Sequence, residues 1–212
     1  MHGVRHFLGQ FGRRLVVAGL LAAPAMSGSA AEEVPGLPVP GSAWIVDPAR
    51  SEIAVRFAVN GSPLGGRFTE FSGAGRFVTG DPSRAELRLA IAAASLDLGI
   101  GIFSRYAAEA EEWFDAQTYP EVVFDLERLE PGDAGSRYLA IGGLTIKGQT
   151  LPAQGRVTLA VENGTARATG ELTVDRAAYD LGLGPSAAIA EVSEVVAVRF
   201  ALEARPKVTD TQ

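Results

Sequence analysis

The residues best suited to acid–base, nucleophilic or metal chemistry are nearly absent from this chain. Its 212 residues include no cysteine and two histidines, and both histidines, His2 and His6, precede an apolar stretch with the character of an export signal. Removal of that signal would leave neither an imidazole nor a thiol. Ser-His-Asp and Cys-His catalysis, a histidine general base, and zinc, haem or iron–sulfur sites built on these ligands are therefore excluded. The remaining chain must act by shape and burial, or through carboxylates, amines and hydroxyls.

The first 31 residues have the pattern of a signal peptide. Basic residues come first, an apolar segment of about eleven residues follows, and small residues end the pattern: Arg5, Arg13 and Arg14, then 15–25, then 27–31. The apolar segment falls short of the roughly 20 residues that span a bilayer, which favours cleavage over an uncleaved anchor. We therefore expect a periplasmic protein without a transmembrane span in its mature chain.

Composition indicates that the rest of the chain is one acidic domain. Loss of residues 1–31 removes three arginines and no acidic residue, so the formal net charge of −6 becomes −9. Such a chain is a poor partner for nucleic acid and for anionic membrane surfaces. The proline-containing segment 32–42 is typical of a linker, residues 43–206 of one domain, and residues 207–212 of a tail.

Alternation of apolar with other residues predicts a domain made mostly of strands. Ile53, Val55 and Phe57 alternate with Ala54 and Arg56, which is the period of a half-buried strand. The same alternation recurs in five further runs and two weaker ones: 87–91, 122–126, 157–161, 168–174 and 196–202, with the weaker runs at 68–78 and 138–146. About eight strands are therefore expected.

Two of these strands are joined by a recognisable turn. Asn163-Gly164 predicts a type I′ hairpin turn, because both central residues of that turn require positive φ. The turn would pair residues 156–162 with residues 165–174.

One stretch departs from the strand pattern. Alanines and acidic residues between Phe103 and Thr118 predict a short helix whose end, with Trp113 and Phe114, docks on the sheet. Tyr119-Pro120 is expected to end this helix.

An antiparallel series of strands with short connections predicts a closed barrel or a sandwich, and closure removes exposed strand edges. We expect an all-β fold, an eight-stranded antiparallel barrel with one short helical insertion. Its strands carry many glycines and alanines, which either leave an open lumen or allow close approach of neighbouring backbones; both interpretations stay open. A lumen lined by Val, Leu and Phe would fit an apolar guest.

A series of short motifs runs through this domain. They are Trp44-Ile45-Val46-Asp47-Pro48, Gly66-Arg67-Phe68, Ala94-Ser95-Leu96-Asp97, Trp113-Phe114-Asp115, Tyr119-Pro120-Glu121, Gly143-Leu144-Thr145-Ile146-Lys147-Gly148, Asp175-Arg176 and Tyr179-Asp180-Leu181-Gly182. Their order and spacing, from Trp44 to about Ala204, resemble the YceI family. The resemblance implies a lipocalin-like barrel, exported in bacteria, that encloses a polyisoprenoid lipid or a quinone tail.

The chain departs from that family at two places where members often carry a histidine. Arg50-Ser51 stands at the first place and Tyr106-Ala107-Ala108 at the second. Headgroup contacts made by those histidines are not expected here, which favours a site selective for the lipid tail.

The hypothesis of a lipid tunnel assigns thirteen ligand-binding residues. Ten are placed on the lumen and three near one mouth: Val55, Phe57, Phe77, Leu89, Ile91, Phe124, Leu144, Leu159, Leu172 and Phe200, with Phe103, Trp113 and Phe114 at the mouth. The alternative at each position is an ordinary packed core. Arg105, Tyr106 and Arg176 are candidates for a polar or headgroup contact, the alternative being a solvated or structural role.

Three classes of function remain open. The first is a carrier for an isoprenoid lipid or quinone, and the second is a hydrolase or isomerase that uses carboxylates in the barrel mouth. The third is a ligand-free, stress-related interaction module. We expect the first, with no catalytic residue, no cofactor besides the lipid, and a homodimer as one candidate assembly.

No metal site is expected either. Glu109, Glu111, Glu112 and Asp115 lack the ligand spacing of a calcium loop. A solvated helix face explains these acidic residues better.

Overall fold

The computed structural model describes residues 43–78, 81–133 and 135–207. The predicted signal peptide and linker lie outside these residues, as does all of the predicted tail except Lys207. Within the described ranges, no helix is both long enough and apolar enough to cross a membrane.

The described chain consists mainly of strands. In chain order they are β1 (Ala43–Val46), β2 (Glu52–Val59), β3 (Ser62–Phe68), β4 (Phe71–Val78), β5 (Asp81–Ala92), β6 (Leu96–Asp97), β7 (Glu121–Pro131), β8 (Arg137–Ile146), β9 (Gln149–Glu162), β10 (Thr165–Asp175) and β11 (Val195–Pro206). The helical elements are α1 (Gly101–Glu109) and the 3-10 helices η1 (Pro48–Arg50), η2 (Ala93–Ser95), η3 (Ala177–Tyr179) and η4 (Pro185–Ala188).

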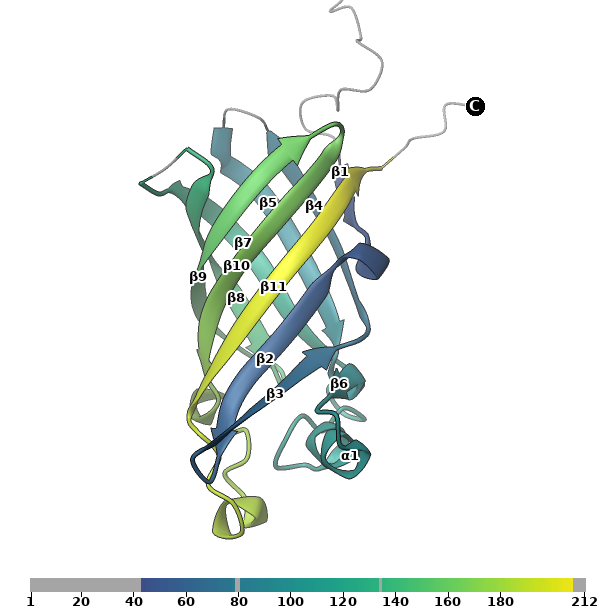
Figure 1. Ribbon diagram of the computed structural model, residues 1–212, viewed down its shortest axis with the longest axis vertical. Coiled ribbons are helices and arrows are strands. Elements are labelled where there is room, and N and C mark those ends of the chain that lie inside the picture. The colour runs from purple at the N-terminus through teal and green to yellow at the C-terminus, as the bar shows by residue number, and fades with distance from the viewer. Residues whose placement is uncertain (1–42, 79–80, 134, 208–212) are drawn as a thin grey trace, which may run out of the picture. The chain divides into compact units, whose positions relative to one another are not determined.

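The strands form one antiparallel sheet that closes on itself (Figure 1). Hydrogen bonding runs through β1, β4, β5, β7, β8, β9, β10 and β11, and β11 pairs again with β1. Eight strands of the described chain therefore complete a ring, which covers most of the edges that an open sheet would expose. The remaining strands, β2, β3 and β6, extend the sheet from β11. The predicted all-β, lipocalin-like antiparallel barrel with one α-helix is confirmed.

The ring depends on β11, because this strand pairs with three others. It pairs along its length with β10, while its residues 204–206 pair with β1 and its residues 197–201 pair with β2. The turn η1 separates β1 from β2, and the side chain of Asp47 caps it by accepting a hydrogen bond of 3.1 Å from the Ala49 amide. The chain thus lies against β11 twice, once on each side of this turn.

Tight turns connect three of the hairpins in the described chain. Asn163-Gly164 joins β9 to β10 as predicted, with φ values of 50° and 72°. Asn60-Gly61 joins β2 to β3 with 50° and 76°, and Lys147-Gly148 joins β8 to β9 with 50° and 74°. Positive φ at both central residues is the requirement of a type I′ turn, whose twist matches that of the flanking strands. The Asn60-Gly61 turn carries the same sequence signal as Asn163-Gly164 but was not among the expectations.

The helix differs from its prediction. It ends at Glu109, ahead of the expected end at Tyr119-Pro120, because Ala110 has extended backbone angles, φ −68° and ψ 134°. Trp113 and Phe114 lie beyond the helix in a turn instead of at its last residues. They still dock on the barrel, since both pack against its apolar core.

Three strands were not expected from the alternation. β6 has two residues and β1 has four, which is too short for a period to be visible. In β3, Pro63, Gly65 and Gly66 interrupt the apolar pattern. The expected weak run at 68–78 crosses the junction between β3 and β4.

Candidate ligand-binding cavity

The barrel encloses a cavity of about 680 Å³. Most of its wall is formed by the inward faces of the strands, and most of the lining side chains are Val, Leu, Ile, Phe or Ala. Ligand sites for small molecules span about 300–1,000 Å³ and are predominantly apolar. The interior is therefore not filled by side chains, which counts against a fully packed barrel.

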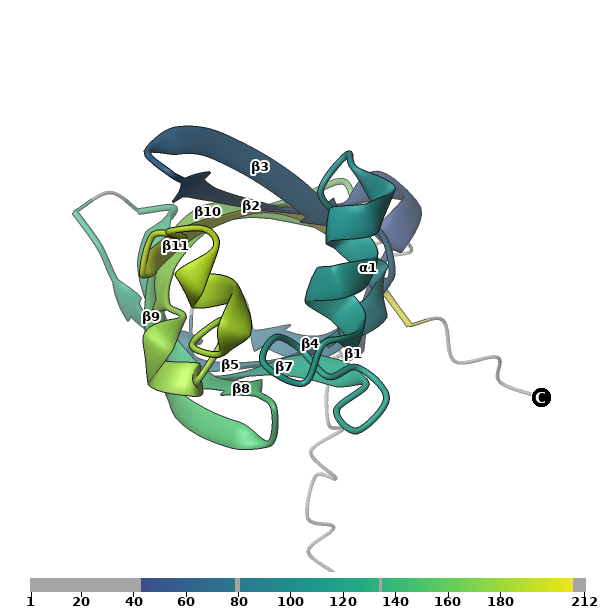
Figure 2. The same cartoon turned by 90° about the horizontal axis from the view of Figure 1, so that it is seen from below.

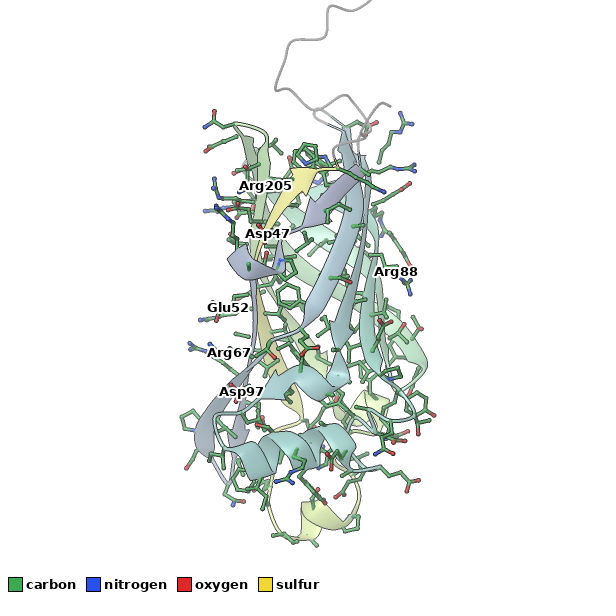
Figure 3. The ribbon with its side chains drawn as sticks, turned by 90° about the vertical axis from the view of Figure 1, so that its right-hand side faces the viewer. Asp47, Glu52, Arg67, Arg88, Asp97 and Arg205 are labelled. Atoms are coloured by element: carbon green, nitrogen blue, oxygen red, sulfur yellow. The ribbon has the colours of Figure 1, made fainter. Side chains whose placement is uncertain are left out.

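Strand alternation separates this cavity from the charged outer wall. On β2, Val55 and Phe57 line the cavity whereas Arg56 between them is exposed. On the outside of β5 and β7, Arg88 donates to the Asp125 carboxylate at 2.7 and 2.9 Å. Figure 3 shows Arg88 and the other labelled charged side chains pointing away from the barrel. The alternation of residue types along each strand thus places apolar side chains on the inner face of the barrel and charged side chains on its outer face.

Every predicted ligand-binding residue lines the cavity. These thirteen are Val55, Phe57, Phe77, Leu89, Ile91, Phe103, Trp113, Phe114, Phe124, Leu144, Leu159, Leu172 and Phe200. Their contact with a ligand stays a prediction. The structure adds further lining residues on the same inward parity, among them Ile53, Val174 and Val198, which the alternation could have supplied.

The small residues of the strands serve both of the purposes that were considered. A Cβ on Gly142 would lie 2.1 Å from the Asp125 carbonyl oxygen, and one on Gly75 would lie 2.3 Å from the Glu86 carbonyl oxygen. These glycines therefore permit close approach of neighbouring strands. Other small residues widen the lumen, since Ala85, Ala140, Gly155, Ala166, Ala168 and Ala204 line the cavity, as does Gly75.

Two irregular segments flank one end of the barrel. We call residues 98–120, which include α1, the first end segment, and residues 176–194, which include η3 and η4, the second end segment. Figure 2, seen from below, shows α1 and the turns of the second end segment on opposite sides of the barrel opening. Both segments supply cavity-lining residues: Leu98, Phe103, Tyr106, Ala107, Trp113 and Phe114 from the first, and Arg176, Leu181, Ser186, Ile189, Ala190 and Val192 from the second.

Glu112 connects the two end segments. Its carboxylate accepts hydrogen bonds from the Tyr106 hydroxyl and from the Ser186 backbone amide, the latter at 3.1 and 3.2 Å. Its carbonyl oxygen accepts from the Gly182 amide at 2.6 Å. The indole of the adjacent Trp113 donates to the Ser186 hydroxyl at 3.2 Å. The expectation that Glu112 belongs to a solvated helix face is wrong, because the helix ends earlier and the side chain turns towards the second segment.

Hydrogen bonding determines the favoured protonation states of Glu112 and Tyr106. The hydroxyl of Tyr106 lowers the pKa of Glu112 from its ordinary value, and the bonds from Ser186 lower it further. The same bond to Glu112 raises the pKa of Tyr106. A carboxylate and a neutral phenol are thus the favoured forms near neutral pH.

Arg176 is a buried cation that lines the cavity with 7% of its surface exposed. Its guanidinium donates to the carbonyl oxygens of Leu181 at 2.5 Å, Val192 at 2.6 Å, Ser193 at 3.0 Å and Gly182 at 3.3 Å. It forms no ion pair with any described residue, and its charge lies 5.9 Å from the centre of the Trp113 ring. Carbonyl dipoles and a ring face therefore compensate the buried charge.

The three headgroup candidates lie in different environments. Tyr106 and Arg176 line the cavity, whereas Arg105 is exposed and is not among the lining residues. The sequence offered no means to separate them, because their positions depend on the fold of the irregular end segments.

Carboxylates are scarce in the described lining. Glu86 is the only acidic residue in it, and it lies 3.9 Å from Arg76 on the outer surface. A carboxylate-based glycosidase needs two carboxyl groups about 5–9 Å apart at its site, and the described lining holds no such pair. Among the described residues there is also no group of three or more His, Cys, Asp or Glu that could hold a metal ion.

A closed antiparallel barrel around an apolar cavity defines the lipocalin-like class of folds. Within that class, a family model for the YceI-like domain matches residues 44–204. The chain belongs to the YceI-like family, as its motifs predicted.

Solved structures agree with this assignment. BcnA of Burkholderia cenocepacia is 30% identical, with a TM-score of 0.68 and coverage of 74% of this chain and 98% of that one. A polyisoprenoid binding domain from Saccharophagus degradans, described as implicated in plant cell wall breakdown, is 18% identical, with a TM-score of 0.61 and coverage of 78% and 99%.

The YCEI protein of Campylobacter jejuni is also 18% identical, with a TM-score of 0.58 and coverage of 68% and 85%. At this identity the two more distant structures support the fold. Among curated proteins, no sequence matches this chain.

Proposed function

We propose that the protein is an exported, non-enzymatic carrier that encloses the prenyl chain of a polyisoprenoid lipid or of a quinone. The observation that carries this proposal is the apolar cavity of about 680 Å³ within the barrel. A prenyl chain is long, flexible and without polar groups, and it needs an apolar tunnel rather than a set of directional hydrogen bonds.

Family membership supports the same ligand. The chain belongs to the YceI-like family, and a structural neighbour of 18% identity is described as a polyisoprenoid binding domain. The two histidines that family members often carry, and that could contact a headgroup, are replaced here by Arg50-Ser51 and by Tyr106-Ala107-Ala108. Selection by the tail therefore fits this chain better than selection by the head.

Burial of the tail supplies the driving force. Each methylene removed from water contributes about 0.8 kcal/mol, so a few isoprene units give several kcal/mol before the cost of ordering the chain is subtracted. A polar head would lie towards the end segments, where Tyr106, Arg176 and Ser186 are lining residues with hydrogen-bonding or charged groups.

Export to the periplasm is part of the proposal. Its support is the order of basic, apolar and small residues within 1–31. Assembly as a homodimer is compatible with carriage of a lipid but is not required by it.

The decisive experiment is solvent extraction of the protein purified from its native envelope, followed by mass spectrometry. We expect a prenyl lipid or a quinone in stoichiometric amount. Absence of both, together with no protection of the protein when either is added, would exclude the carrier function.

A variant within the cavity tests its role directly. Leu159→Arg places a charge in the lumen, and we expect at least a tenfold loss of prenyl-lipid binding because a cation is costly in an apolar interior. Thr158→Arg is the matched control, since Thr158 is exposed on the outer face of the same strand. Binding by a folded Leu159→Arg protein at the control level would show that the lumen is not the lipid site.

A further inference from the structure

Large apolar side chains are exposed around the cavity end formed by the two end segments. We define the apolar rim as Ile100, Ile102, Phe103, Tyr106, Leu183 and Ile189. Ile189 is 85% exposed, Ile102 is 66% exposed, and Phe103 and Leu183 are each 53% exposed. Apolar surface that gathers in one place on a soluble domain marks an interaction site more often than isolated exposed residues do.

The rim continues into the cavity. Phe103, Tyr106 and Ile189 are exposed and also line the cavity. Ser62 and Pro63, in the β2–β3 hairpin, share both properties. An uninterrupted apolar path therefore leads from the outer surface at this end into the lumen.

The opposite end of the described barrel lacks such a cluster. Ile45 of β1 is the large apolar residue with notable exposure there, at 42%, and it pairs with Arg205 near the end of β11. Figure 1 shows β1 at the end of the barrel away from α1. The two ends are thus chemically different, and only one is suited to contact with an apolar phase.

The charges around the rim are predominantly acidic. The two end segments contain seven acidic residues and two basic ones: Glu109, Glu111, Glu112, Asp115, Asp180, Glu191 and Glu194 against Arg105 and Arg176. Arg176 is buried, so Arg105 is the exposed cation of these segments, and Lys147 of the β8–β9 turn adds a second cation by donating to the Glu111 carbonyl oxygen at 2.7 Å. Such a border repels anionic lipids and complements the ammonium groups of zwitterionic phospholipids.

We propose that the apolar rim docks the barrel, mouth first, on a zwitterionic phospholipid surface, where the cavity exchanges its lipid with the membrane. The proposal rests on the carrier function argued above. A prenyl chain has negligible solubility in water, so a path that keeps it in apolar surroundings from bilayer to lumen removes the largest barrier to its transfer. Insertion of exposed Ile, Phe and Leu side chains at the headgroup boundary supplies the attachment.

Vesicle flotation with the protein purified from its native envelope, after removal of its export signal, tests this surface. Vesicles of phosphatidylcholine and phosphatidylethanolamine are expected to carry the protein, and inclusion of phosphatidylglycerol is expected to weaken the association at low salt. The double variant Ile102→Glu/Ile189→Glu should reduce the vesicle-bound fraction at least tenfold. The single variants Ile102→Glu and Ile189→Glu are each compared with Ile45→Glu, which makes the same single change at an exposed isoleucine of the other end. Circular dichroism checks that each variant is folded. If the glutamates disturb the fold of the end segments, the double variant Ile102→Asn/Ile189→Asn replaces the glutamate variant in the flotation test.

Several outcomes would overturn the docking surface. Wild-type protein that stays with the aqueous fraction would do so, and so would equal flotation of the rim variant and the Ile45 control. A wild-type dimer that the rim variant dissociates would assign the rim to a second copy of the chain instead. Solvent extraction of the same preparations distinguishes failure of the docking proposal from failure of the carrier proposal. Protein that contains a prenyl lipid but does not float refutes the docking surface alone, whereas protein that contains no lipid refutes the carrier function.

Discussion

Glu112 shows how a single side chain can join parts of the chain that are distant in sequence. It accepts from the hydroxyl of Tyr106 on α1 and from the amide of Ser186, which lies 74 positions further along the chain. These bonds hold the two end segments together beside the cavity mouth. They also give the mouth a protonation-dependent contact, because the carboxylate form of Glu112 is the acceptor.

We predict that Glu112→Gln changes the pH dependence of stability. The folded-state pKa of Glu112 is lowered, so its contribution is complete above the ordinary carboxyl pKa and is lost as the pH falls through the lowered value. The variant should therefore unfold at a lower temperature than the parent at pH 7, and this difference should disappear as the pH falls through the lowered pKa. Thermal unfolding followed at several pH values measures this.

Glu203 provides an internal reference for that experiment. Burial raises the pKa of Glu203, but the neighbouring Arg167, Arg205 and Arg50 lower it by more, so this residue also contributes to acid sensitivity. Its contribution is present in parent and variant alike. A difference in stability between parent and variant that stays constant as the pH falls from 7 through the acid range would contradict the assignment to Glu112.

Sequence reasoning at this scale placed residues of the lumen and three apolar residues near the mouth in the cavity lining, but it missed the contact between Glu112 and Ser186. Val55 and Phe57 could be placed because strand parity, once one residue is known to face inward, decides every second position. Glu112 and Ser186 lie outside strands, so no period relates them. Their contact depends on how two irregular segments fold over the barrel end.

Among the described side chains, Arg176 makes the largest number of hydrogen bonds to the second end segment. Its guanidinium donates hydrogen bonds to four carbonyl oxygens within residues 181–193. No other described side chain donates to a carbonyl oxygen of these residues. Burial of these carbonyl groups without such a donor would destabilise the folded state. One arginine thus gives an irregular segment a defined path.

We predict that Arg176→Lys destabilises the protein by about 1–3 kcal/mol, because an ammonium group offers fewer donors and cannot span four carbonyls. Limited proteolysis should accelerate within residues 177–193. Arg105→Lys is the control, since Arg105 is exposed on α1, and it should leave both stability and proteolysis unchanged. Equal behaviour of the two variants in urea unfolding would show that the second end segment does not depend on Arg176.

Elements with long alternation were predictable from sequence, whereas short and irregular ones were not. β11 has twelve residues, and its apolar residues Val196, Val198, Phe200 and Leu202 predict a strand unambiguously. β6 exists only because its two residues find partners in β3. Sequence periodicity predicts strands that have a long alternating pattern of their own. Short strands form because a neighbouring segment pairs with them, and this pairing is not visible in their own sequence.

The whole barrel combines a charged outer wall, an apolar cavity and an apolar rim at one end. The closed fold could be predicted because about eight amphipathic strands with short connections have few other ways to bury one face. The chemical difference between the two ends could not be predicted, because nothing in the sequence distinguishes the exposed Ile102 and Ile189 from isoleucines of the core. It appears only when their segments are placed in space.

We predict that removal of bound lipid lowers the thermal stability of the whole molecule. A ligand that binds the folded state at a hundred times its Kd stabilises by about 2.7 kcal/mol, which in a domain of this size corresponds to several degrees in Tm. Delipidated protein should therefore unfold at a lower temperature and recover on addition of a prenyl alcohol. A water-soluble short-chain alcohol is the control. No recovery with the prenyl alcohol would contradict binding in the cavity.

The pairing of β11 sets the order of events in biosynthesis. It is the last strand of the described chain, and β10 and β1 each keep one edge without a partner until residues 195–206 have left the ribosome. The pairing of Trp44 with Pro206 joins positions about 160 residues apart, and such distant contacts form slowly. The hairpins β2–β3, β8–β9 and β9–β10 can pair during synthesis, but the cavity comes into existence only when the final strand docks. The proposed ligand can therefore enter the cavity only after the whole barrel has been synthesised.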